Sequence, residues 1–114
     1  MTNIPFQTID WSNVAITEHK GETGVAFWQT LNVDGIRLRL VEYSPNYLAD
    51  HWCQKGHIVH CIEGEFISKL KNGDQFLMSK GMTYIVSDNL SSHRSSTHSA
   101  VKLLIIDGGF LASK

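Results

Sequence analysis

Apolar residues recur along this chain with a period of two, in short runs that turn-forming residues separate. This alternation predicts β-strands, because successive side chains of a strand point to opposite faces. No segment has the periodicity of a useful amphipathic helix. The sequence therefore favours an all-β sandwich or barrel of about eight to ten strands. Strands are predicted over residues 24–31, 35–43, 57–64, 65–71, 74–79, 82–87 and 100–107.

Two dipeptides and one polar segment separate these strands. Asn72-Gly73 is typical of a type I′ hairpin turn, in which both central residues take positive φ. Asp34-Gly35 predicts a second tight reversal, between the first two runs. Residues 88–99 are polar, and they are predicted to form a loop or an irregular edge.

Length and charge limit what the chain can be. Its 114 residues are enough for one hydrophobic core, since domains commonly contain about 100–150 residues, so we expect a single domain over 1–114. Ten basic and eleven acidic residues give a net charge of -1, without a dense Lys/Arg cluster, and we expect no nucleic-acid partner. The longest apolar run, residues 103–106, is too short to cross a bilayer, and the amino end lacks a signal-peptide pattern. We expect a cytoplasmic protein without a membrane partner, whose two cysteines are thiols.

Residues 51–61 contain three of the six histidines and both cysteines of the chain. Two donors at i and i+2, with a third four positions later, can bind one ion if the chain bends between them at Gly56 and a fourth donor comes from another strand. The four candidate metal ligands are His51, Cys53, His57 and His93.

The spacing of these residues resembles the first motif of the cupins, which runs His, one residue, His, three or four residues, Glu, six residues, Gly. In this chain the matching positions are His51, Cys53, His57 and Gly64. Cysteine replaces the second histidine of the motif, and histidine replaces the glutamate. The number of anionic ligands is unchanged, because a thiolate takes over the negative charge of the carboxylate.

The second cupin motif runs Gly, five residues, Pro, one residue, Gly, two residues, His. Gly81 matches its start, Ser87 and Asn89 replace the proline and the second glycine, and His93 comes one residue late. The resemblance covers about residues 35–107, preceded by N-terminal strands within 1–34. Within the family, the uncharacterised "DHCW motif" cupins are the most similar, although the order here is Asp-His-Trp-Cys at 50–53.

The resemblance implies an RmlC-like double-stranded β-helix, or jelly-roll barrel, whose four metal-ligand positions hold the candidate donors. It also implies a homodimer and a small polar molecule bound in the barrel. A thiolate is a softer donor than a carboxylate, which favours zinc or iron, with nickel and copper as further candidates. If the protein is an enzyme, the resemblance implies dioxygenase-like or isomerase-like chemistry at the metal. The alternative is a non-catalytic metabolite-binding or sensing module with a structural metal or none.

Five further residues have open roles. Arg37 and Arg39 share one strand face, which is either solvated or binds a carboxylate. Cys61 is expected to pack in the core. Asp50 and Glu63 are candidates for orienting the imidazoles of metal-ligating histidines.

Overall fold

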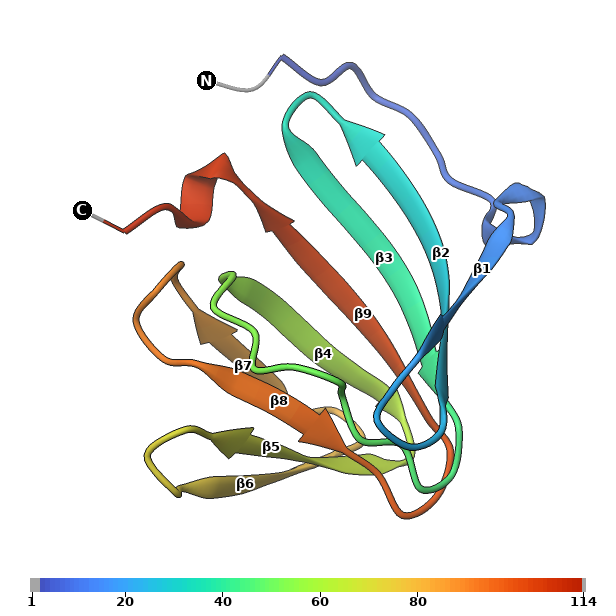
Figure 1. Ribbon diagram of the computed structural model, residues 1–114. Coiled ribbons are helices and arrows are strands. Elements are labelled where there is room, and N and C mark those ends of the chain that lie inside the picture. The colour runs from blue at the N-terminus through green and yellow to red at the C-terminus, as the bar shows by residue number, and fades with distance from the viewer. Residues whose placement is uncertain (1–2, 114) are drawn as a thin grey trace.

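The computed structural model describes residues 3–113, which form nine β-strands and two short 3-10 helices (Figure 1). The helices are η1 (Trp11–Asn13) and η2 (Gly109–Leu111). Neither is long or apolar enough to span a membrane. The strands are β1 (Ile16–Lys20), β2 (Val25–Val33), β3 (Ile36–Tyr43), β4 (His57–Glu63), β5 (Glu65–Leu70), β6 (Gln75–Ser79), β7 (Thr83–Val86), β8 (His93–Ser96) and β9 (Val101–Gly108).

The strands form two antiparallel sheets, as the all-β prediction expects. The larger sheet has the order β1-β2-β3-β9-β4-β7, and the smaller has the order β6-β5-β8. β9 lies between β3 and β4, so the last strand of the chain joins the N-terminal strands to the central part of the sequence. In Figure 1 the smaller sheet lies across from the β4 and β7 end of the larger sheet, and the segment between β3 and β4 runs through the space between them.

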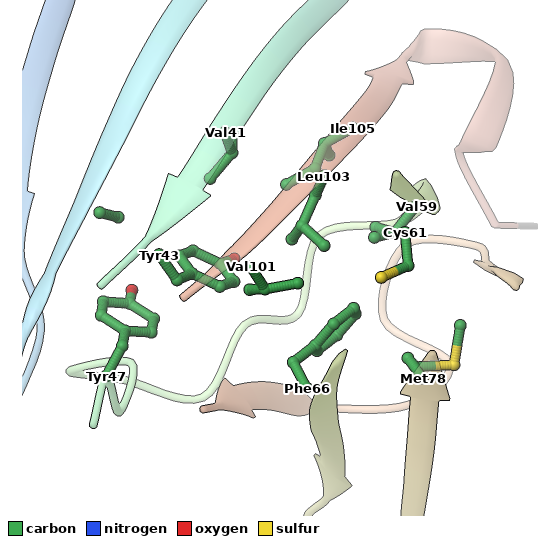
Figure 2. Packing of buried hydrophobic residues seen from close by; sticks show 11 residues of the cluster. Val41, Tyr43, Tyr47, Val59, Cys61, Phe66, Met78, Val101, Leu103 and Ile105 are labelled. Carbon is green, nitrogen blue, oxygen red and sulfur yellow. The ribbon is translucent and has the colours of Figure 1, made fainter. Parts of the chain in front are cut away.

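Alternate residues of the larger sheet face the smaller one and form the core (Figure 2). On β9 these are Val101, Leu103 and Ile105, and on β4 they are Val59 and Cys61. Phe66 of β5 and Met78 of β6 close the core from the other side. Cys61 is fully buried in this cluster, which confirms the prediction that it packs in the core.

One of the two predicted tight turns has the expected backbone. Asp34 and Gly35 both have positive φ, 46° and 82°, and they connect β2 to β3. Between β5 and β6, however, only Gly73 has positive φ, and the connection spans residues 71–74. The type I′ prediction for Asn72-Gly73 is therefore wrong. Instead, the Asn72 side chain accepts a hydrogen bond from the Asp74 amide at 2.9 Å, so Asn72 shapes a longer turn.

Residues 88–99 were predicted to form a loop or an irregular edge, and the loop alternative is wrong at 93–96, where β8 is an edge strand of the smaller sheet. This strand pairs with β5 on one side, and on the other side Cys53 forms a bridge with His93. The inward residues of β8, His93 and Ser95, are polar although they are buried. Sequence periodicity missed the strand because its inner face lines a polar cavity rather than the apolar core.

Candidate metal centre

Three of the four predicted ligands come together at the start of β4. Cys53, His57 and His93 each place one donor atom within 4.8 Å of the others. His57 is the first residue of β4, and its side chain points inward with Val59. Cys53 and His93 are held opposite each other by two backbone hydrogen bonds of 2.7 and 3.0 Å. The register slip in the second motif does not remove His93 from the site, since this backbone pairing sets its position.

The imidazole of His57 is oriented by a buried carboxylate. Its Nδ1 lies 3.0 Å from Oδ2 of Asp107, which is 1% exposed. An ionised carboxylate only accepts hydrogen bonds, so Nδ1 of His57 carries the proton and donates it. Nε2 of His57 faces Sγ of Cys53 at 3.3 Å. This arrangement directs one ring nitrogen toward the thiol.

His93 is oriented in the same way by the backbone. Its Nδ1 donates a hydrogen bond to the carbonyl of Ser91 at 2.8 Å. The other ring nitrogen, Nε2, is buried and has no hydrogen-bond partner among residues 3–113. A neutral imidazole that donates from Nδ1 has its lone pair on Nε2. Metal-bound histidines usually use their second nitrogen in this manner, so both imidazoles fit a metal ion bound beside Cys53.

The thiol of Cys53 has the acidity that metal binding requires. Burial raises its pKa, but the hydrogen bond with His57, the nearby imidazole of His93 and the charge of His57 outweigh this effect and lower the pKa to about 5. The same contact with Cys53 outweighs burial at His93 and raises the pKa of that imidazole. The thiolate is the form of cysteine that binds metals. Two imidazoles and a thiolate form a donor set suited to zinc or iron.

Asp107 also binds two arginines, which identifies the role of the charged face of β3. Arg37 donates to both carboxylate oxygens at 2.9 Å, and Arg39 donates from Nη2 to Oδ2 at 3.0 Å. Arg39 is only 5% exposed, so the solvated alternative is wrong for this residue. Burial alone raises the pKa of Asp107, but the hydrogen bonds from Arg37 and the nearby positive charges lower it overall.

Sequence reasoning missed Asp107. Its signal was its position on β9, where it has the same parity as Val101, Leu103 and Ile105 and is therefore a charged residue on the inward face of an apolar strand. A charge at such a position needs a partner, and Arg37 and Arg39 supply it.

His51, the fourth predicted ligand, lies outside the group of three donors. Its side chain is 73% exposed, and its Nδ1 contacts Asp50 at 2.7 Å. Asp50 thus contacts an imidazole, as the sequence suggested, but neither of the two imidazoles in the donor group. Glu63 is exposed at the end of β4, opposite Lys102 in the register with β9, and its side chain has no ion pair with a histidine among residues 3–113.

The three donors lie in the wall of a cavity of about 570 Å³. Aromatic side chains on the wall include Trp28, Tyr43 and Tyr84. The ring of Trp28 stacks on His19 at 3.7 Å between centroids, and the guanidinium of Arg39 lies 4.5 Å from its centre. The cavity is large enough for a small molecule next to the donor group.

No protein-family model matches the chain, and none of the curated proteins matches it either. Solved structures do match. A predicted oxalate decarboxylase from Thermotoga maritima has a TM-score of 0.75 at 12% identity, covering 88% of this chain and 96% of that protein. An RmlC-like cupin from Shewanella frigidimarina has a TM-score of 0.72 at 13% identity and covers 92% of both chains. The chain has the cupin fold. Fe(II)-HppE is a further structural match, with a TM-score of 0.73 at 10% identity, covering 94% of this chain and 63% of that protein.

The expected double-stranded β-helix of the cupins is thus confirmed. The resemblance to the "DHCW motif" cupins stays a prediction, since no family model matches the chain. The likeness to these solved structures concerns the fold, and the chemistry of this protein must be argued from its own residues.

Proposed function

We propose that this cupin binds a divalent transition metal through Cys53, His57 and His93 and takes a small polar ligand in the adjoining cavity. The observation that supports this most directly is the convergence of the three donor atoms within 4.8 Å. In both imidazoles Nδ1 is already engaged, by Asp107 or by the Ser91 carbonyl, so Nε2 is available for a metal. Zinc or iron suits the donor set best, and the Fe(II) in the name of the matching HppE structure agrees with iron.

Three protein donors leave an open position on a four-coordinate ion. Such a metal would supply Lewis-acid chemistry or a site for an exchangeable ligand. If the exposed side chain of His51 turned inward and became a fourth ligand, the site would be closed and structural. The arrangement of the three donors favours the open form, which permits either an enzyme or a ligand-binding protein.

Elemental analysis of the untagged protein tests this proposal. Wild-type protein should contain zinc or iron, and the Cys53→Ser and His57→Ala variants should lose most of it. Cys61→Ser is the matched control, because Cys61 is buried in the core outside the donor group. Circular dichroism establishes that each variant is folded. Equal metal content in all four proteins would rule out the site.

A second candidate function is thiol chemistry without a metal. The thiol of Cys53 lies 3.3 Å from Nε2 of His57, and Nδ1 of the same imidazole lies 3.0 Å from Oδ2 of Asp107. This order is the one that activates a nucleophile. Alkylation by iodoacetamide distinguishes the two candidates: a metal-bound thiolate should be protected in the protein as purified and become reactive after chelation. A metal-free nucleophile should react equally before and after chelation.

We also propose that the cupin is a homodimer. A row of aliphatic side chains crosses the outer face of the larger sheet in register, and it consists of Leu31, Leu38, Ile106, Ile58 and Ile85. Ile85 is 69% exposed. A second copy of this chain would bury the row, which supports the expected dimer. Light scattering after gel filtration should give the mass of two chains, and Ile58→Glu should shift it to that of one.

A further inference from the structure

The cavity beside the donor group collects positive charge. Within residues 3–113, five of the nine lysines and arginines line it, compared with only one of the eleven acidic residues, Asp50. The cationic residues are Lys20, Arg37, Arg39, Lys55 and Arg94. This concentration stands out because the whole chain has a net charge of -1. A cavity lined by one sign of charge raises the local concentration of ligands of the opposite sign.

The deepest of these charges is only partly compensated. Arg37 and Arg39 share a single carboxylate, Asp107, so these three residues together carry one net positive charge, and the guanidinium of Arg39 is the buried one. Within the described part of the chain, Arg39 donates one side-chain hydrogen bond, and its buried Nε has no partner. A guanidinium buried with few acceptors is costly unless another anion approaches it. Arg39 lines the cavity, where such an anion can bind.

Arg39 is also close to the donor group. Oδ2 of Asp107 accepts hydrogen bonds from Nη2 of Arg39 and from Nδ1 of His57, both at 3.0 Å. One carboxylate oxygen therefore bridges the guanidinium and a proposed metal ligand. An anion that binds Arg39 from the cavity lies beside the Cys53, His57 and His93 group.

We propose that the ligand of this cavity is a small organic carboxylate, bound by Arg39 and attracted by the lysines at the rim. The planar guanidinium matches the two oxygens of a carboxylate. A neutral ligand of the same shape would leave the buried Nε of Arg39 without an anionic acceptor. This inference deepens the proposed function by naming a ligand class, but it depends on the arginine rather than on the metal.

Isothermal titration calorimetry tests it with matched probes, on the protein as purified and after chelation. Succinate and benzoate are compared with their amides, succinamide and benzamide, and inorganic phosphate is a separate arm. The carboxylates should bind, and the amides should bind at least about tenfold more weakly, since a hydrogen-bonded charge pair is lost. Tighter binding of phosphate than of either carboxylate, equal binding of acids and amides, or no binding of either acid would overturn the proposal.

Variants assign the binding to Arg39. Arg39→Lys keeps the charge but removes the planar fork, and it should weaken carboxylate binding about tenfold or more. Lys102→Gln is the matched control, because Lys102 lies on the outer face of β9, away from the cavity, and its loss should leave the affinity unchanged. If Arg39→Lys fails to fold, the double variant Lys20→Gln, Lys55→Gln removes two exposed rim charges and should weaken binding and its dependence on salt. Unchanged affinity in the folded variants would contradict the proposal.

The two proposals fail separately. The protein as purified could contain no metal and still bind carboxylates after chelation. That result would contradict the proposed metal site and support the anion site. Bound metal together with equal affinities for acids and amides would support the metal site and contradict the anion site.

Discussion

Asp107 accepts a hydrogen bond from Nδ1 of His57 at 3.0 Å, although fifty positions of sequence separate the two residues. β4 and β9 are neighbours in the larger sheet, and both residues are on its inward face. The same carboxylate binds Arg37 and Arg39. Asp107 therefore connects the proposed metal ligands to the cationic wall of the cavity, and this connection leads to the first prediction.

Replacing Asp107 with Asn should weaken both folding and metal binding. Two guanidiniums would lose their buried anion, which typically costs about 3–5 kcal/mol of unfolding free energy. His57 would lose the carboxylate that fixes its tautomer, which lowers metal affinity by about 10–100-fold in comparable sites. Urea denaturation and competition with a chromogenic chelator measure the two effects. Asp74→Asn, in an exposed turn, is the control and should change neither. Wild-type stability in Asp107→Asn would contradict the role of the buried carboxylate.

The metal-free protein should show an unusually acidic thiol. Only the thiolate reacts with iodoacetamide, so alkylation of Cys53 should be half-maximal near pH 5, its pKa in the folded protein, rather than near 9.0. The folded pKa lies below the unfolded value, so this thiol contributes stability that is fully present above pH 9 and decreases as the pH falls through 5. Mass spectrometry separates Cys53 from buried Cys61. A midpoint near 9 would show that the imidazoles do not stabilise the thiolate.

His51 and His93 should differ in their importance for the metal. His93 belongs to the donor group, while His51 is exposed and contacts Asp50. We expect His93→Ala to lose most of the bound metal and His51→Ala to keep it. Elemental analysis of both variants measures this directly. Loss of metal in His51→Ala, with the fold retained, would establish His51 as a fourth ligand and the site as closed.

Gly56 should not tolerate a side chain. A Cβ at this position would lie 2.6 Å from the Val86 carbonyl and 2.7 Å from the amide of Asp88, and neither backbone atom can move freely. Gly56→Ala should therefore cost about 1–3 kcal/mol of unfolding free energy and displace His57, the next residue. Gly109→Ala is the control, because nothing lies within 4 Å of its Cβ position and its φ is not in the left-handed region. Thermal denaturation compares the two, and equal melting temperatures would contradict the steric argument.

The sequence singled out Cys53 and His57 as candidate donors because they lie close together in the chain, and the structure places their donor atoms within 4.8 Å of each other. It also suggested His93, whose spacing deviates from the cupin motif, but the backbone bridge to Cys53 that positions it joins residues forty positions apart. β8 itself was missed, since its inward face is polar. The type I′ turn was wrong at Asn72-Gly73, where the side chain of Asn72 accepts a hydrogen bond from the backbone amide of Asp74, two residues later.

Period-two alternation, turn dipeptides and a dense group of histidines and cysteines were enough to establish an all-β chain with a candidate metal site, because each depends on residues close together in sequence. Strand pairing decided the rest. It brought β9 beside β3 and β4, and so joined Asp107 to Arg37, Arg39 and His57. It also left His51 in solvent. The role of a buried charge depends on its partner, and the partners of Asp107 lie on β3, which is far from β9 in the sequence and adjacent to it only in the folded sheet.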